Sequence, residues 1–139
     1  MPLEPSTQIL KAFEKAKKQF GFDDVSIETC IELPEVTIIA CKGNIGSLIG
    51  KNGIIISSIK KELNKKIRVV EHTKNTKKII DDIIGNVRLL GVNEIFKPEG
   101  KTIRIIINNQ DKEKLITTPK NLQKAIEQLT SAKTEILFQ

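Results

Sequence analysis

Hydrophobic residues recur along this chain first at helical spacing and then in short strand-like runs. Over residues 7–20, lysines occupy one side of a helix and apolar residues the other, namely Ile9, Leu10, Phe13, Ala16 and Phe20. Gly21 predicts the end of this helix. The pattern then predicts strands over 25–32 and 36–41, a short helix over 44–49, a helix over 54–63 and a strand over 66–71. The order of elements is therefore αββααβ.

The same order begins again at once. A helix is predicted over 75–84, strands over 87–96 and 102–108, a short helical segment over 111–116, a helix over 119–130 and a strand over 134–138. Two copies of one unit account for the chain without a long structureless loop. We therefore predict an α+β protein with domains over 1–73 and 74–139, each a small three-stranded sheet covered by helices.

A glycine-rich segment, GNIGSLIGKNG, follows the second strand at residues 43–53. Gly50 and Gly53 bracket Lys51 and Asn52, and glycines let a backbone turn sharply and come close to a ligand. A tight loop that presents a lysine and a helix N-terminus to one point suits phosphate. We expect the site to include Gly46, Ile49, Gly50, Lys51, Asn52 and Gly53.

Three other interpretations of this segment are less favourable. Asn52-Gly53 is typical of a β-hairpin turn, but apolar residues on both sides of it have helical spacing. A P-loop needs one more residue before Lys51, and a Ser or Thr where Asn52 stands. The glycine spacings also do not give the dinucleotide-binding fingerprint.

Positive charge is concentrated around the same segment. The chain has 23 basic and 17 acidic residues, a net charge of +6. Residues 42–78 hold ten basic residues against Glu62 and Glu71, a net of +8, which leaves −2 for the rest. Such a concentration is typical of a phosphate-binding surface, although a solvated lysine-rich face would give the same count. The added candidates for contact are Lys42, Lys60, Lys61 and Arg68.

Composition narrows the classes of function. The chain has five Phe and no Trp or Tyr, so it lacks the aromatic platforms on which many single-strand binders stack bases. No apolar run reaches membrane-spanning length, and the N-terminus around Glu4 is unlike a secretory signal, so we expect a cytoplasmic protein away from membranes. No cysteine and histidine cluster has metal-ligand spacing, and we expect neither a cofactor, a metal nor an enzyme.

The two cysteines, Cys30 and Cys41, fall on the arms of a predicted hairpin centred near Pro34. This places Cys30 opposite about Ile38, with Cys41 roughly 10 Å further along the strand. That separation is too large for a disulfide. We expect both thiols to be reduced and half-buried.

The αββααβ order with a Gly-x-x-Gly loop resembles the type II KH domain of RNA-binding proteins. The tandem resembles the archaeal NusA-like transcription termination factors, most clearly in the Cys30 strand, the run from Val36 to Gly53, and KKIRVVEHT at residues 65–73. The resemblance implies single-stranded RNA binding, regulation of transcription elongation or termination, and RNA polymerase as a partner. An adaptor on RNA polymerase or the ribosome, with incidental RNA contact, remains the alternative.

The second copy departs from this pattern at the loop. Ile116-Thr117-Thr118-Pro119-Lys120 stands where the first copy has Ile49 to Gly53, so both loop glycines are missing. Thr118 and Pro119 still suit the start of a helix, but Pro119 lacks an N–H donor. We expect this domain to be structural or to bind a protein partner, with weak RNA contacts at Lys112, Lys114 and Lys120.

Overall fold

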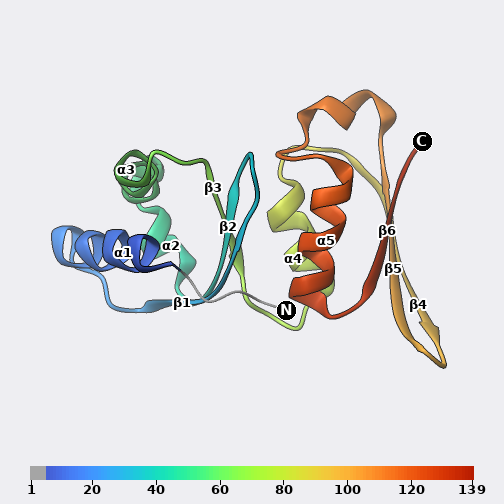
Figure 1. Cartoon of the computed structure of the whole chain (residues 1–139), viewed down its shortest axis with the longest axis horizontal. Coiled ribbons are helices and arrows are strands. Elements are labelled where there is room, and N and C mark those ends of the chain that lie inside the picture. Colours follow the sequence, from blue (N-terminus) through green and yellow to red (C-terminus); the bar gives the residue numbers. More distant parts are fainter. Residues whose placement is uncertain (1–5) are drawn as a thin grey trace. The chain divides into compact units, whose positions relative to one another are not determined.

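A computed structural model describes residues 6–139, and the chain divides into two compact units between Thr73 and Lys74 (Figure 1). Each unit is an α+β assembly with one three-stranded mixed sheet and helices against it. The predicted N-terminal features around Glu4, and the first five residues of the predicted first domain, lie outside the described residues. Within residues 6–139, no helix is both long enough and apolar enough to cross a membrane.

The first unit has the predicted order of elements. These are α1 (Thr7–Phe20), β1 (Val25–Glu32), β2 (Thr37–Gly43), α2 (Ile45–Ile49), the 3₁₀ helix η1 (Lys51–Gly53), α3 (Ile54–Leu63) and β3 (Ile67–Glu71). Strand β2 is central, antiparallel to β1 and parallel to β3. This arrangement requires a crossover between β2 and β3, and α2, η1 and α3 supply it.

Helix α1 shows why the predicted boundaries hold. The Ser6 side chain accepts a hydrogen bond from the backbone N–H of Ile9 at 3.3 Å, which caps the first turn. Gly21 ends the helix in the left-handed conformation, with φ of 71°. The buried face of α1 packs with α3 and one face of the sheet, in a core that includes Phe13, Cys30, Ile39, Leu48 and Ile59.

The β1–β2 hairpin differs from the prediction by one residue. Only Pro34 and Glu35 lie in the turn, where the Leu33 N–H donates to the Val36 carbonyl at 2.9 Å. Cys30 therefore pairs with Ile39 rather than Ile38. Cys41 lies two residues beyond Ile39 on the same face of the sheet, about 7 Å along the strand.

Both cysteines are free, as predicted, but the expectation that they are half-buried was wrong. Cys30 is 1% exposed and Cys41 is 0% exposed, because their face of the sheet is covered by the helices. Burial raises the pKa of the Cys30 thiol to about 11 and that of Cys41 to about 12. Both thiols are therefore protonated at neutral pH and poor nucleophiles.

The second unit repeats the topology. Its elements are α4 (Thr76–Ile84), β4 (Leu89–Lys97), β5 (Gly100–Ile107), the 3₁₀ helix η2 (Asn109–Lys114), α5 (Pro119–Thr130) and β6 (Lys133–Phe138). Strand β5 is central, antiparallel to β4 and parallel to β6. Helices α4 and α5 lie on the same face of this sheet (Figure 1). The predicted helical segment over 111–116 is instead the earlier η2.

Candidate functional site

The glycine-rich segment begins where β2 meets the chain between α1 and β1. Gly43 has φ of 100°, and a Cβ on it would lie 2.2 Å from the Asp24 carbonyl oxygen, so only glycine fits. Directly after it, the Asn44 backbone N–H donates to that same carbonyl at 2.8 Å. The Asn44 side chain donates to the Asp24 carboxylate at 3.2 Å. The start of α2 is thereby fixed to the end of β2.

Asp24 holds this junction as an ionised carboxylate. A hydrogen bond from the Ser47 side chain is the main cause that lowers its pKa, and Asn44 adds to it. Neither Asp24 nor Gly43 was among the residues predicted for the site. The signal available in the sequence was their position, since Asp24 precedes one strand of the hairpin and Gly43 ends the other.

The loop backbone adopts three conformations that most residues avoid. Gly50 has φ of 79° with ψ of 172°, Asn52 has φ of 57°, and Gly53 has φ of 72°. Asparagine is among the few side chains that enter this region readily. A Cβ on Gly50 would lie 2.7 Å from Cγ1 of the buried Ile55. The loop is therefore tight because of its glycines.

Backbone hydrogen bonds hold this shape. The Gly50 N–H donates to the Gly46 carbonyl at 2.8 Å, and the Gly53 N–H donates to the Gly50 carbonyl at 3.1 Å. Lys51 and Asn52 are consequently at the exposed tip, with Ile49 just before them. The structure thus brings together all six residues predicted for the loop.

The N-terminus of α3 lacks a side-chain cap. Gly53 occupies the N-cap position and has no side chain to accept from the first turn, whereas Ser6, Asn75 and Thr118 cap α1, α4 and α5. Backbone N–H groups in the first turn of a helix have no partner within the helix. Together with the positive end of the helix dipole, they attract an anion.

Lys51 adds a cation at this helix end. Its side chain is exposed, and among residues 6–139 it forms no ion pair. Two apolar side chains flank the loop, with Ile49 38% exposed and Ile54 58% exposed. Ile54 was missed because the helical pattern gave it no role. Ile54 is apolar but falls outside the spacing of the buried residues of α3, and this was the signal in the sequence that could have identified it.

The other predicted basic residues of this unit are not brought to the loop. Lys60 and Lys61 lie in the last turn of α3, about 10 Å along the helix axis from its first residue. There they favour the helix electrostatically. Lys42 and Arg68 alternate along their strands with core residues, so their side chains leave the sheet on the face opposite α3. The Lys42 Nζ also lies 3.8 Å from the Glu28 carboxylate.

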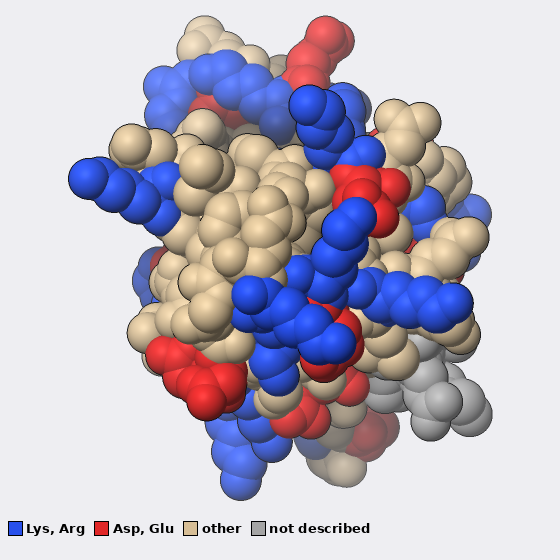
Figure 2. All heavy atoms as spheres, turned by 90° about the vertical axis from the view of Figure 1, so that its left-hand side faces the viewer, with Lys and Arg blue, Asp and Glu red and all other residues tan. Residues whose placement is uncertain are grey.

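Positive charge is more evenly distributed between the two units than the count over residues 42–78 indicates. Residues 1–73 carry eleven basic and nine acidic residues, a net of +2, and residues 74–139 carry twelve and eight, a net of +4. In the first unit, Lys15 pairs with Glu62 at 3.3 Å and Lys65 with Glu32 at 3.0 Å. Figure 2 shows the α1 and α3 side, where basic side chains gather in separate clusters with acidic and uncharged residues beside and between them. This side has no continuous basic face.

The corresponding turn of the second unit is closed by its own side chains. Thr118 accepts from the Asn121 N–H at 3.2 Å, and the Asn121 side chain donates to Thr117 at 3.3 Å. Helix α5 buries Leu122 and Ile126 with the spacing at which α3 buries Ile55 and Ile59. When the two units are aligned on these buried residues, the first turn of α5 corresponds to the glycine loop of the first unit.

A buried carboxylate holds the segment before this turn. Asp111 is 1% exposed and accepts hydrogen bonds from the Arg88 backbone N–H at 2.8 Å and the Arg88 Nε at 2.9 Å. The Arg88 side chain is the largest of the causes that hold the pKa of Asp111 well below its usual range. Lys114 also pairs with Asp111, at 3.3 Å.

The three lysines predicted for weak contacts in this unit differ in their surroundings. The Lys112 Nζ lies 4.9 Å from the centre of the Phe138 ring, in a cation–π arrangement. Lys114 is engaged with Asp111. Lys120 is exposed, and no ion pair within residues 6–139 involves it.

Comparison with known proteins informs the fold. No protein-family model matches the chain, and no curated protein is significantly similar to it. Among solved structures, the chain is similar to a crystal structure of a protein called APE1850, with 20% sequence identity and a TM-score of 0.64. The match covers 97% of this chain and 100% of the other. This likeness shows a shared α+β fold.

Proposed function

We propose that the protein binds single-stranded RNA, that its two units are type II KH domains, and that the RNA backbone lies on the Gly50–Gly53 loop. The observation that carries the proposal is the combination at this loop of positive-φ glycines, a Lys51 without an ion pair within residues 6–139, and a helix N-terminus without a side-chain cap. A KH loop clamps the nucleic-acid backbone through the same elements. The first unit also has the αββααβ order of a type II KH domain, and the second has the same order with the 3₁₀ helix η2 in place of the first crossover helix.

The bases would be recognised without aromatic stacking. Ile49 and Ile54 place exposed apolar surface on both sides of the loop, where it can contact base faces while the phosphates meet Lys51 and the α3 N-terminus. The resemblance to archaeal NusA-like factors extends the proposal to regulation of transcription elongation or termination in the cytoplasm, with RNA polymerase as partner.

The test is a double substitution at the loop tip, Lys51→Asp with Asn52→Asp. Two carboxylates would then face the phosphates, and both side chains are exposed, so the core is untouched. Fluorescence anisotropy with a labelled, unstructured RNA oligonucleotide should show binding abolished. RNA affinity equal to that of the parent protein would refute the loop assignment.

The chain offers a matched control at the other end of the same helix. Lys61→Asp with Asn64→Asp makes the same change of charge at exposed residues, and Asn64 has a positive φ that aspartate also tolerates. This variant should retain RNA affinity within about threefold, since long-range charge effects are screened by salt. If both double variants lose binding equally, net charge rather than the loop is responsible.

The adaptor function is the second candidate, and the ion pairs of the first unit favour it. Because Lys15, Lys42 and Lys65 are paired with glutamates, fewer cations are left for phosphates than the sequence count indicates. Salt dependence separates the two functions. If three to five phosphates are contacted, log K should fall against log salt with a slope of about −2 to −3.5. A slope near zero would favour the adaptor.

A further inference from the structure

A groove in the second unit is lined by none of the residues of the two turns described above. It has a volume of about 670 Å³ and runs between α4 and β4, with Lys74 to Lys77 on one side and Leu89 to Val92 on the other. Glu94 and Lys101 complete its lining. From Leu89 to Glu94 the strand is roughly 17 Å long, at about 3.3 Å per residue. The groove is therefore long enough for an extended segment of several residues.

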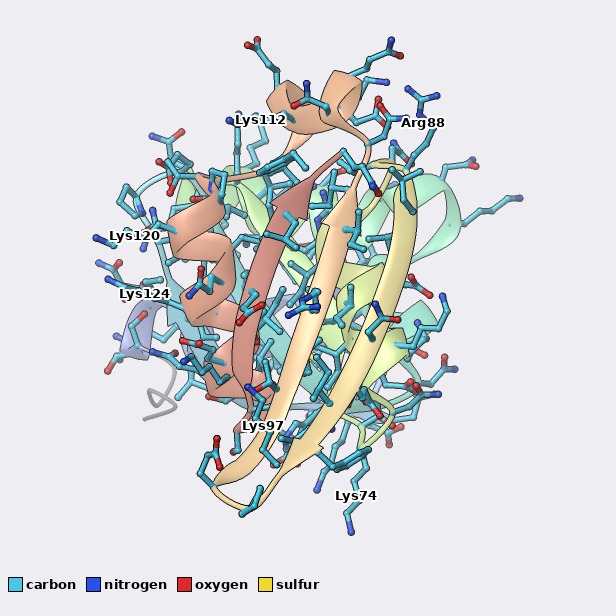
Figure 3. The ribbon with its side chains drawn as sticks, turned by 90° about the vertical axis from the view of Figure 1, so that its right-hand side faces the viewer. Lys74, Arg88, Lys97, Lys112, Lys120 and Lys124 are labelled. Carbon is cyan, nitrogen blue, oxygen red and sulfur yellow. The ribbon has the colours of Figure 1, made fainter. Side chains whose placement is uncertain are left out.

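One wall of the groove is an open sheet edge. Within residues 6–139, β5 is the only strand that pairs with β4, so the other edge of β4 carries backbone donors and acceptors that pair with no strand. The register shifts between Leu89 and Gly91, which leaves Leu90 without a partner on β5. Figure 3 shows this sheet with β4 at its right-hand margin and Lys74 below it. Such an edge is a template for a further strand.

Side chains at the edge define what could pair with it. Leu90 is 51% exposed and supplies an apolar contact beside the backbone. Three lysines, Lys74, Lys77 and Lys101, line the groove against one glutamate, Glu94. The Lys101 Nζ lies 3.4 Å from that glutamate and donates to the Thr76 hydroxyl at 3.1 Å. The Lys77 Nζ lies 3.3 Å from the Asp81 carboxylate on α4, in an exposed ion pair that an incoming anion would have to share. Within residues 6–139 Lys74 forms no ion pair, so it is the first cation available to such an anion.

We propose that the groove between α4 and β4 binds an extended acidic peptide, which adds a strand to β4 by main-chain hydrogen bonds and places carboxylates near Lys74 and Lys77. Main-chain pairing gives such a complex its affinity, and alternate side chains give it specificity. A peptide fits better than RNA, because the Asn75 side chain already accepts from the first turn of α4 and the open edge of β4 offers main-chain partners that a nucleic-acid backbone cannot pair with as a strand. The groove also has no aromatic lining on which bases could stack.

The probe is an octapeptide of alternating glutamate and valine, labelled with fluorescein and titrated with the full chain. Binding should protect the β4 amides from hydrogen exchange. A version N-methylated at every residue has no N–H donor with which to pair along a strand, and should bind at least tenfold more weakly, about 1.4 kcal/mol. A lysine–valine octapeptide should also lose binding because the groove is basic. Equal binding of the octapeptide and its N-methylated form would overturn the proposal, as would no binding.

Variants locate the site. Lys74→Glu with Lys77→Glu should weaken the glutamate peptide more than tenfold, and both new side chains lie at or before the first turn of α4, where acidic residues suit the helix dipole. Leu90→Asp should also weaken it. The matched control is Lys124→Glu with Lys133→Glu on α5 and β6, where Lys124 lies across the sheet from Lys74 (Figure 3), and it should bind like the parent.

Two further outcomes distinguish this groove from the RNA loop. The Lys51→Asp, Asn52→Asp variant should bind the peptide as the parent does, so a failure of the loop assignment leaves this proposal standing. If the RNA oligonucleotide protects the β4 amides and the Lys74 and Lys77 variant weakens RNA instead of peptide, the groove belongs to a nucleic-acid path and the peptide proposal is wrong.

Discussion

The two units share one topology but differ in the turn before the last helix. In the first unit the chain passes through Gly50, Asn52 and Gly53 with positive φ, and α3 begins without a side-chain cap. In the second unit, Thr118 caps α5 and Pro119 starts it. Each turn joins a short helical segment to a longer helix, and the two longer helices have the same spacing of buried residues. The fold is therefore compatible with either turn.

This comparison shows which features of the glycine loop are not required by folding. The second unit completes its crossover without glycines at the turn and uses side-chain hydrogen bonds to satisfy the helix start. The first unit instead holds backbone in conformations that cost free energy for most residues. Such strain persists in functional sites, and the exposed donors and Lys51 indicate what the loop would hold. The second unit thus serves as an internal reference for the first.

Exchanging one residue between the turns should have the largest effect. Gly50→Thr introduces the residue of the second unit at a φ of 79°, with its Cβ 2.7 Å from Ile55. The left-handed backbone and the clash should together destabilise the first unit by about 2 to 4 kcal/mol. Urea unfolding with hydrogen exchange at α3 amides measures this loss.

The reverse exchange provides the control. Thr117→Gly removes a buried side chain whose hydroxyl accepts from Asn121, and should destabilise the second unit by about 1 to 2 kcal/mol. If Gly50→Thr is as mild as Thr117→Gly, the glycine is not required for the loop conformation, and the contrast between the turns is wrong.

Charge reversal compares the two turns as RNA contacts. Lys51→Glu should reduce RNA affinity by more than tenfold, over about 1.4 kcal/mol, because Lys51 lies beside uncapped N–H groups. Lys120→Glu should reduce it by less than tenfold, since the Thr118 side chain already accepts from the Asn121 N–H in the first turn there. Both lysines are exposed, so neither change should alter stability much. Equal losses in anisotropy titrations would show a continuous RNA path over both turns.

Much of the fold could be predicted because strong local signals mark the element ends. Residues 7–20, 54–63 and 119–130 were predicted as helices with the observed bounds, since apolar spacing and residues such as Gly21 and Pro119 act locally. The predicted 111–116 segment was misplaced because a long-range contact decides it. Asp111 is fixed by Arg88, which lies on the far side of the β4–β5 hairpin in sequence.

The candidate site was predicted less completely than the fold. The loop residues are contiguous, so their grouping did not depend on tertiary structure. Lys42 and Arg68 were grouped with them by charge alone, and strand alternation places both side chains on the opposite face of the sheet. Asp24 was missed for the converse reason. Its contacts with Gly43 and Asn44 join two segments that the sequence keeps apart.

Removing the cap of the second turn should have a smaller effect. Thr118→Ala deletes the oxygen that accepts from the Asn121 N–H, and should destabilise the second unit by about 1 kcal/mol. RNA affinity should not change, because the proposed contact lies in the first unit. Thermal unfolding and anisotropy on the same variant test both statements. A loss of RNA affinity would show that the closed turn also contributes to binding.

The smallest effect at neutral pH concerns the aspartates that hold the two crossovers. Asp24 and Asp111 both have pKa values below the ordinary 3.8. The hydrogen bond from Ser47 is the main cause of the lowered pKa of Asp24, whereas the hydrogen bonds from Arg88 hold the pKa of Asp111 well below its usual range. A lowered folded-state pKa stabilises the fold above the unfolded value, and this contribution is lost as pH falls toward the folded value. Stability should therefore be flat from pH 7 to about 5 and fall below about 4.

Carboxyl ¹³C titration by NMR follows Asp24 in the first unit and Asp111 in the second unit separately. Asp24 is exposed and should titrate only somewhat below its ordinary range, whereas the buried Asp111 should stay ionised until the second unit unfolds. Protonation would weaken the four interactions that its buried carboxylate makes with Arg88 and Lys114, so unfolding and protonation should coincide. Titration of Asp111 near pH 4 in a folded second unit would show that Arg88 does not hold the closed turn as described.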